Sequence, residues 1–186
     1  VKIFSNRECE FAYRSSIFKN KLKGKYLITS VSFKLKKNPV EFDLSYGTLK
    51  ERVLTKGLTT ISTVRHTVIE IRKEKLPEPD EIGNAGSFFK NPEIKHAHFL
   101  DIKAEYPEVP HYAAGSSVKV PAAWLIEKCG WKGYRKGDAG VHSRQALVLV
   151  NYGNASGKEI LELSEEIIQS VSGKFGIRLE REVNVV

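Results

Sequence analysis

A long amphipathic helix, predicted over Ser156–Phe175, constrains the fold of this chain more than any other segment. Ser156 and Glu159 have the spacing of a capping box, in which each side chain binds the backbone N–H of the other residue. Gly176 stands where helix C-termini favour glycine. The apolar residues at helical spacing are Ile160, Leu163, Ile167, Val171 and Phe175. One apolar face of this length requires a second layer of structure to cover it.

Two further helices are predicted from the signals at their ends. One covers Thr60–Lys75, with its threonine as N-cap and Pro77 as the residue that stops it. The other is short and covers Pro121–Cys129, with proline at its start and Gly130 just past its end. Trp124 fits the apolar face of this short helix, so we expect it in the core.

Three stretches are predicted to form β-structure. Residues 1–37 contain Tyr26–Leu35, which alternates loosely and is rich in β-branched and aromatic residues. Ala146–Val150 has the composition of a buried strand, and Ile177–Val186 is a predicted final strand. Helices and strands do not alternate strictly along the chain. The sequence therefore favours an α+β fold, with a mixed or antiparallel sheet and packed helices.

The chain carries an excess of positive charge. It has 30 lysines and arginines against 22 acidic residues, a net charge of +8 over 186 residues. This excess suggests an anionic partner without identifying it. The basic residues are scattered, and no zinc-finger spacing, RNP-like string or basic heptad region accompanies them. A nucleic-acid-binding domain stays open as an alternative, but we expect no nucleic acid as the partner.

Other classes of site find no support in the sequence. No run approaches the roughly 18 apolar residues of a membrane span, so no membrane partner is expected. Cys9 and Cys129 are expected to be free thiols, because their spacing fits neither a metal site nor a disulfide framework. His96 and His98 have no third ligand nearby, so we interpret them as solvated loop histidines and expect no metal.

Chemistry is most concentrated in Lys75–Pro92, KLPEPDEIGNAGSFFKNP. The stretch from Gly83 to Gly86 lets backbone approach a ligand closely, and both glycines permit a positive φ. Ser87 follows on this predicted turn, with lysines and an amide on either side. A hydroxyl in such surroundings can serve an anionic substrate. As a bare pattern, a serine on a glycine turn is more often an ordinary turn hydroxyl with its hydrogen bonds satisfied than a catalytic group.

Five strings carry a resemblance to a known family. They are GNAGSFFKNP at Gly83–Pro92, FAYRSSIFK at Phe11–Lys19, LSYGTL at Leu44–Leu49, HSRQALVLVN at His142–Asn151 and LEREV at Leu179–Val183. In order and in approximate spacing they resemble UDP-N-acetylenolpyruvoylglucosamine reductases, flavoenzymes of bacterial cell-wall precursor synthesis. The resemblance covers nearly all of the chain.

The resemblance implies an FAD- and NADPH-dependent oxidoreductase of the bacterial cytoplasm. Its substrate would be UDP-N-acetylglucosamine enolpyruvate, reduced to UDP-N-acetylmuramate for peptidoglycan. Residues 1–58 would be the C-terminal remnant of an FAD-binding domain, including a tyrosine loop, and residues 59–186 the substrate-binding domain. The family's glycine-rich loop that cradles the FAD pyrophosphate does not precede Val1. We therefore expect a fragment that lacks most of the flavin domain and is inactive alone.

The resemblance also implies three catalytic residues. Ser87 would be the acid that protonates the α-carbon, and Glu182 would assist on the opposite flank of the enolpyruvyl group. Arg14 would pair with the substrate carboxylate and support Glu182. The family motif selects Glu182 over Glu180, because the functional residue precedes the valine. Without the motif, a solvated glutamate and a surface arginine would be the ordinary interpretations.

Five residues are implied as substrate contacts. Tyr46 and Lys75 are assigned to the diphosphate, and Lys75 with Arg14 is a candidate source of charge near Ser87. Asn91, Tyr112 and Gln145 are assigned as further contacts. Lysine against phosphate and tyrosine against a sugar or base are physically reasonable pairs. A half-buried loop aromatic is the alternative for Tyr112, and a lysine favoured by a helix dipole is the alternative for Lys75.

A different class of function also stays open, a stand-alone module that binds a nucleotide sugar or a polyanion. It predicts binding without any redox partner. A glycine-rich FAD loop encoded upstream of Val1 would decide between this module and the reductase.

The purified 186-residue chain is expected to be colourless, because most of the FAD cradle lies outside it. A visible absorbance spectrum of the purified chain tests this expectation. A stoichiometric band of bound flavin would contradict it. The same chain incubated with free FAD and then desalted is the control for weak binding.

Overall fold

A computed structural model describes residues 1–37 and 41–185. The chain forms two compact units, Val1–Leu44 and Ser45–Val186, and each is described by itself. Helices and two antiparallel sheets coexist without strict alternation, so the predicted α+β class is confirmed. No helix within the described ranges is long and apolar enough to cross a bilayer.

The first unit contains little regular structure. Its described residues form one turn of 3₁₀-helix, Ile17–Lys19, and an isolated bridge between Ala12 and Ser15. The predicted strand over 26–35 is therefore wrong. Its sequence suits a strand, but a strand needs a hydrogen-bonding partner, and the described part of this unit supplies none. Phe4 packs edge-on against Phe18 and Tyr26, with ring centroids 5.0 and 5.2 Å apart.

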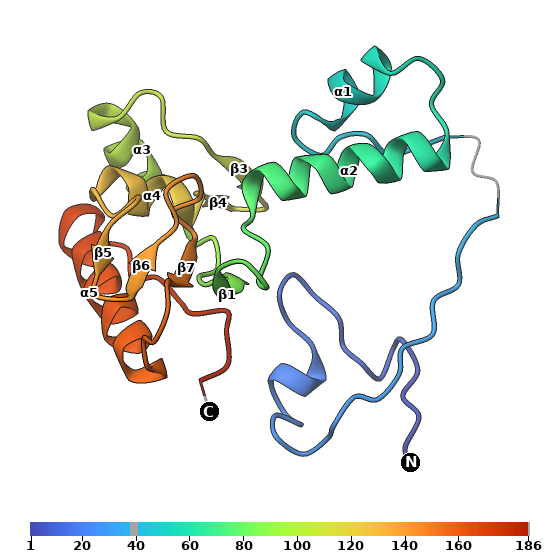
Figure 1. Cartoon of the computed structure of the whole chain (residues 1–186), viewed down its shortest axis with the longest axis horizontal. Coiled ribbons are helices and arrows are strands. Elements are labelled where there is room, and N and C mark those ends of the chain that lie inside the picture. Colours follow the sequence, from blue (N-terminus) through green and yellow to red (C-terminus); the bar gives the residue numbers. More distant parts are fainter. Residues whose placement is uncertain (38–40, 186) are drawn as a thin grey trace. The chain divides into compact units, whose positions relative to one another are not determined.

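The second unit begins with two packed helices, α1 (Leu49–Thr55) and α2 (Ile61–Lys75) (Figure 1). The sequence predicted α2 and missed the shorter α1. Thr60 caps α2 as expected, because its hydroxyl accepts the Thr63 N–H at 3.1 Å. Arg52 on α1 forms two hydrogen bonds with Glu74 on α2, at 2.7 and 2.6 Å.

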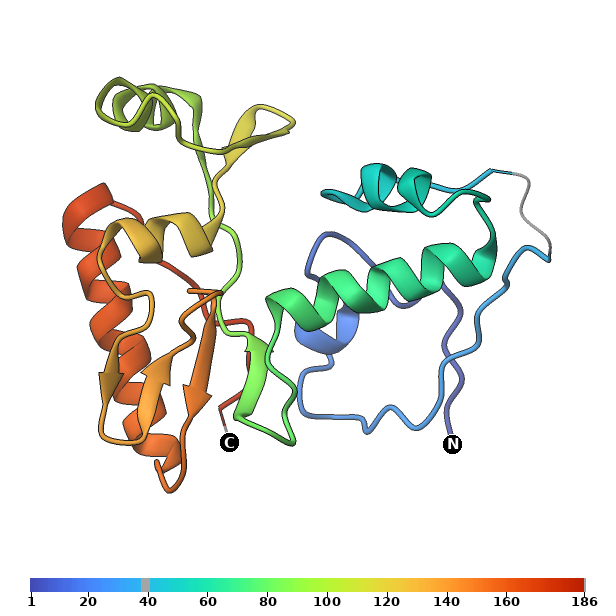
Figure 2. The same ribbon diagram turned by 45° about the horizontal axis from the view of Figure 1, so that its top comes forward.

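A four-stranded antiparallel sheet forms the centre of the second unit (Figure 2). The strand order is β1-β7-β6-β5. The four strands are β1 (Gly83–Ser87), β7 (Val148–Asn151), β6 (Ala139–Val141) and β5 (Arg135–Lys136). Helix α5 (Gly157–Phe175) packs on this sheet, and α4 (Ala122–Lys128) packs on α5. The predicted buried strand at 146–150 appears two residues later, as β7.

Helix α5 confirms the strongest prediction from the sequence. The Ser156 hydroxyl accepts the Glu159 N–H at 3.2 Å, and Glu159 accepts the Ser156 N–H at 2.7 Å. Gly176 ends the helix with φ of 65°. The buried residues on the helix are Leu163, Ser164, Ile167, Ile168, Val171 and Phe175. Trp124, which was predicted in the core, is instead partly buried at its edge and packs against Phe175 with ring centroids 5.7 Å apart.

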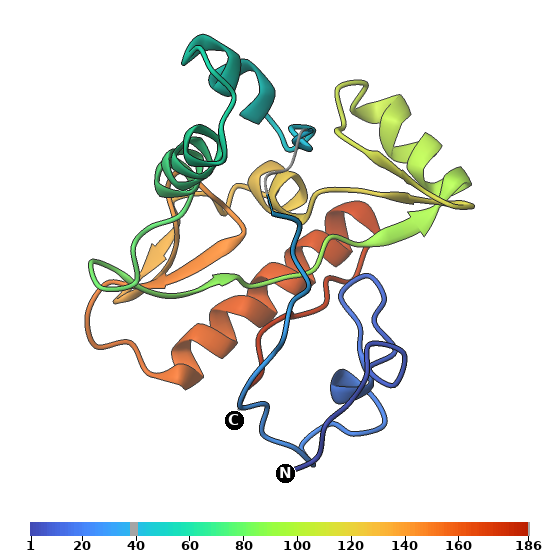
Figure 3. The ribbon, with the colours of Figure 1, turned by 90° about the vertical axis from the view of Figure 1, so that its right-hand side faces the viewer.

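A second, three-stranded sheet has the order β2-β4-β3. Its strands are β2 (Glu93–Lys95), β4 (Ser117–Lys119) and β3 (Tyr112–Ala114). Helix α3 (His96–Glu105) packs beside it (Figure 3). The interpretation of His96 and His98 as loop residues is therefore wrong. Both lie on α3, and the His98 Nε2 is 2.8 Å from the Phe175 carbonyl oxygen.

The final strand predicted over 177–186 is reduced to one bridge, between Arg181 and Phe89. Two backbone hydrogen bonds flank the bridge, from Lys90 N–H to Glu180 O and from Glu182 N–H to Phe88 O. The pairing ends because Asn91 and Pro92 carry the partner chain toward the second sheet, and proline has no N–H to donate. Val186 lies outside the described residues.

Replacing Ile167 with alanine should destabilise the fold by about 2–5 kcal/mol, because it opens a cavity under α5. Ile167 is completely buried. Ile61→Ala is the matched control, since Ile61 is 55% exposed on α2. Urea unfolding followed by circular dichroism measures both. If the free energy of unfolding fell no more for Ile167→Ala than for Ile61→Ala, this account of the core would be contradicted.

Candidate functional site

Ser87 ends β1 beside an irregularity in the strand pairing, between Asn84 and Ser87. The Asn84 side chain forms this irregularity: its Nδ2 donates to Ile82 O at 2.8 Å, and its Oδ1 accepts the Gly86 N–H at 3.0 Å. Gly86 has the expected positive φ, 71°, whereas Gly83 pairs with Asn151 in ordinary strand geometry. The predicted turn is therefore a bulged strand, which redirects the side chain that follows.

The backbone of Phe88 joins three segments next to Ser87. Its N–H donates to Leu147 O at 2.8 Å, and its carbonyl accepts the Glu182 N–H at 2.8 Å. The segments that contain the sequence-predicted Gln145 and Glu182 are thereby hydrogen-bonded to the residue that follows Ser87. Ser87 and Glu182 are both half-buried. The buried phenylalanine beside Ser87 fixes this junction, and sequence reasoning assigned it no role.

The two candidate glutamates have different surroundings. The Glu180 side chain is 74% exposed and pairs with Lys90 Nζ at 2.9 Å. Glu182 is half-buried, and its backbone pairs directly with Phe88. The difference agrees with the choice of Glu182, because Glu180 has the exposure of a surface residue.

Asn91 and Gln145 take part in local structure. The Asn91 Oδ1 accepts the Ala122 N–H at 2.9 Å, at the start of α4, and leaves the amide NH₂ as the group that can meet a ligand. The Gln145 carbonyl accepts the Val148 N–H at 3.0 Å as the chain enters β7. These bonds fix the side chain of Asn91 and the backbone of Gln145.

Tyr46 and Lys75 lie together, with Lys75 Nζ 5.7 Å from the centre of the Tyr46 ring. Tyr46 is 61% exposed, and Gly47 next to it allows the turn with φ of 52°. Tyr112 is equally exposed but belongs to β3 of the second sheet. Its predicted contact with substrate therefore stays a prediction.

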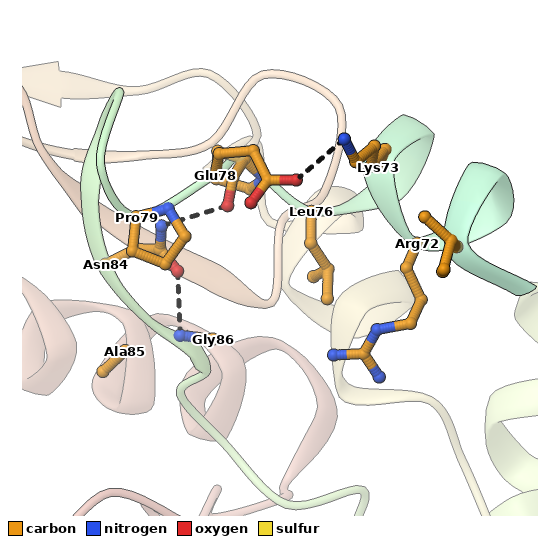
Figure 4. Close-up of a pocket in the computed structure, with 10 residues that line it drawn as sticks. Arg72, Lys73, Leu76, Glu78, Pro79, Asn84, Ala85 and Gly86 are labelled. Atoms are coloured by element: carbon orange, nitrogen blue, oxygen red, sulfur yellow. Dashed lines mark hydrogen bonds and ion pairs between the residues drawn. The ribbon is translucent and has the colours of Figure 1, made fainter.

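A cavity of about 320 Å³ lies between the end of α2 and β1 (Figure 4). Arg72 and Leu76 extend from α2 on one side, and Asn84 to Gly86 form the other side. Lys73 turns to Glu78, 3.9 Å away. Arg72 was not among the residues predicted from the sequence. Its spacing of three residues from Lys75 could have identified it, because residues at i and i+3 share a helix face.

Arg14 belongs to the first unit, and its role beside Glu182 stays a prediction. It is one of two non-glycine residues with positive φ among those described, at 53°. Its guanidinium carbon lies 6.0 Å from the Tyr13 ring centre. No group of three or more potential metal-ligating side chains forms in the described ranges 1–37 and 41–185.

His142 is a buried polar residue close to the site. It is 4% exposed, and its Nδ1 has no hydrogen-bond partner among the described residues. Burial lowers the pKa of His142 below its ordinary value, and the positive charge of Arg144 lowers it further. The neutral imidazole is therefore the form that the fold accommodates.

Comparison with known proteins gives a consistent result. Residues 78–186 match a family model described as UDP-N-acetylenolpyruvoylglucosamine reductase, C-terminal domain. The whole chain is 50% identical to the reductase of that name from Flavobacterium johnsoniae and covers 56% of it. It is 47% identical, again over the whole chain, to that of Porphyromonas gingivalis and covers 55% of it. The chain thus spans about half the length of these curated relatives.

A solved structure, the reductase from Thermus caldophilus, is 25% identical, with a TM-score of 0.40. That match covers 67% of this chain and 35% of the solved chain.

The stability of the fold should decline as the pH falls below about 6.5, because the unfolded chain then protonates His142 more readily than the native protein does. Above that pH the imidazole is neutral in both states and contributes no pH dependence. Urea midpoints between pH 8 and 5 measure this effect. His142→Gln should show a shallower decline below pH 6.5, and an identical decline in both proteins would contradict the assignment.

Proposed function

Because this chain belongs to the UDP-N-acetylenolpyruvoylglucosamine reductase family, we propose that it is the substrate-binding part of such an enzyme. The whole enzyme would reduce the enolpyruvyl double bond of UDP-N-acetylglucosamine enolpyruvate and give UDP-N-acetylmuramate, a peptidoglycan precursor, in the bacterial cytoplasm. The observation that carries this proposal is the junction at Phe88, which supports the half-buried Ser87 and Glu182 on neighbouring backbones.

In the proposed reaction, hydride addition to the β-carbon leaves enolate character beside the substrate carboxylate. A proton must then reach the α-carbon. The Ser87 hydroxyl would donate it, because β1 ends at Ser87 and the bulge at Gly86 directs this residue. Glu182 would act from the opposite flank of the enolpyruvyl group. A serine hydroxyl is a weak acid, so fixed charge must stabilise the developing anion.

Substrate binding would use the cationic groups near the end of α2. Lys75, beside the Tyr46 ring, would contact the diphosphate. Arg72 would add a second cation from the cavity between α2 and β1. Guanidinium and ammonium groups both suit phosphate oxygens, and arginine adds a planar, two-pronged donor. Asn91, Gln145 and Tyr112 would supply further contacts to the sugar and nucleotide.

FAD, reduced by NADPH, would supply the hydride in the whole enzyme. The described residues do not fit the phosphates of this cofactor. The glycines with positive φ that precede β1 are Gly24, Gly47 and Gly57, which lie singly and far apart, whereas a pyrophosphate cradle clusters its glycines. No residue of this chain is therefore assigned to the cofactor.

The domain organisation is part of the same proposal. Residues 1–58 would be the end of the flavin-binding domain, and residues 59–186 the substrate-binding domain. Arg14 would act from the former by pairing with the substrate carboxylate. The family model supports the second part, because it covers residues 78–186.

In the whole enzyme, Ser87→Ala should slow substrate reduction by about 10²–10⁴-fold, the usual contribution of a positioned acid. Flavin reduction by NADPH should keep its rate, because that step delivers no proton to the substrate. Stopped-flow absorbance follows the two half-reactions separately. Ser87→Cys should be intermediate, since a thiol can donate a proton but is larger.

Ser117→Ala is the matched control, because Ser117 is another half-buried strand serine, in β4. It should leave both half-reactions unchanged. If Ser87→Ala slowed both half-reactions equally, or neither, Ser87 would be a structural residue and the assignment would be wrong.

A further inference from the structure

Arg181, immediately before Glu182, ties the C-terminal segment to helix α5. Its Nε donates to Ser164 Oγ at 2.8 Å, and its Nη2 donates to Glu165 Oε2 at 2.7 Å. The Arg181 side chain is only 25% exposed, and Ser164 is completely buried. The Ser164 hydroxyl gives its own proton to Leu161 O at 2.6 Å, so its oxygen is oriented to accept from Arg181. Each group in this cluster has a defined partner.

The backbone alone holds Glu182 weakly. Within the described range, two backbone hydrogen bonds join its segment to the strand after Ser87: Lys90 N–H donates to Glu180 O, and Glu182 N–H donates to Phe88 O. Such a short pairing can shift or fray more easily than a long ladder. The residues before it are held by the core, because Ile177 and Leu179 are buried. The two neighbours of Glu182 are both attached to the fold: Val183 packs, partly buried, against the core, and Arg181 forms charged hydrogen bonds with α5.

The anchor is attached to the best-fixed element of the unit. Helix α5 is capped at both ends and packs on the central sheet. The Arg181 hydrogen bond is the main cause that lowers the pKa of Glu165, so that carboxyl stays ionised at neutral pH. Charge-assisted hydrogen bonds are stronger and more directional than neutral ones. The guanidinium fork can bind both acceptors at once, which a lysine ammonium cannot do in the same geometry.

We propose that Arg181 is a positioning residue, which holds Glu182 in register beside the Ser87 strand by binding Ser164 and Glu165 on α5. The inference rests on the proposed roles of Ser87 and Glu182. Its physical basis is the sensitivity of proton transfer and charge stabilisation to geometry, where a shift of about 1 Å can cost about 10²-fold in rate. Arg181 itself contacts α5 and needs no contact with substrate.

The test uses the whole enzyme and three variants: Arg181→Ala, Arg181→Lys and Arg178→Ala. Arg178 is the matched control, because it approaches the same Glu165 only to 3.9 Å and its side chain is 74% exposed. Arg181→Ala should slow substrate-driven flavin reoxidation by about 10–100-fold, with little change in KM and normal flavin reduction by NADPH. Arg181→Lys should recover only part of this rate, and Arg178→Ala should match the wild type.

A double-mutant cycle with Glu165→Gln separates positioning from general stability. If Arg181 acts through Glu165, then Arg181→Ala should cost much less in the Glu165→Gln background than in the wild type. Thermal melts of each variant identify a temperature at which all variants are folded. The rates are measured at that temperature, so they refer to folded enzyme. Loss of thermal stability with an unchanged reoxidation rate would overturn the proposal, as would equal slowing of both half-reactions.

Failure of the proposed function would look different. If the wild-type enzyme showed no substrate-driven reoxidation, or Ser87→Ala kept the full rate, the catalytic site itself would be wrong and the role of Arg181 would fall with it. A normal wild-type rate, a slow Ser87→Ala variant and an unaffected Arg181→Ala variant would overturn the positioning role alone.

Discussion

The packing of α5 on the antiparallel sheet is the interaction on which the rest of the second unit depends. Its buried apolar face covers β6 and β7, and β7 pairs with β1, the strand that ends at Ser87. Its ends are closed by the capping box at Ser156 and by Gly176. The same helix presents Ser164 and Glu165 to Arg181. One element therefore supports the core, the sheet beneath Ser87 and the segment that bears Glu182.

The candidate site is built where regular structure ends. Ser87 is the last residue of β1, Gln145 precedes β7, and Glu182 follows a single bridge. Residues at such ends are less constrained by ladders, so side chains must fix them. Asn84 does this for the strand before Ser87, and Arg181 does it for the segment before Glu182. Polar side chains thus provide the precision that backbone pairing leaves incomplete.

Local signals predicted some elements well and others poorly. Helices α2, α4 and α5 were predicted because their caps, stops and apolar spacing lie within the segments themselves. The predictions of strands near both ends of the chain were wrong, because a strand depends on a hydrogen-bonding partner segment that composition does not specify. Ser87, Glu182 and Gln145 came from a resemblance, and the structure brings their segments together at Phe88. Arg181 was missed because its partners on α5 become neighbours only in the folded chain, and Arg72 was missed although its spacing from Lys75 places both on one helix face.

The sequence alone determined the helices with strong caps, the α+β class and the family to which the chain belongs. Those properties follow from short-range patterns and from literal motifs such as GNAGSFFKNP. Only the tertiary structure decided that Glu180 pairs with Lys90 while Glu182 lies against the Phe88 backbone, and that Arg181 reaches α5. These contacts join residues far apart in the chain. Their geometry depends on how a helix and a sheet pack, which no local pattern encodes.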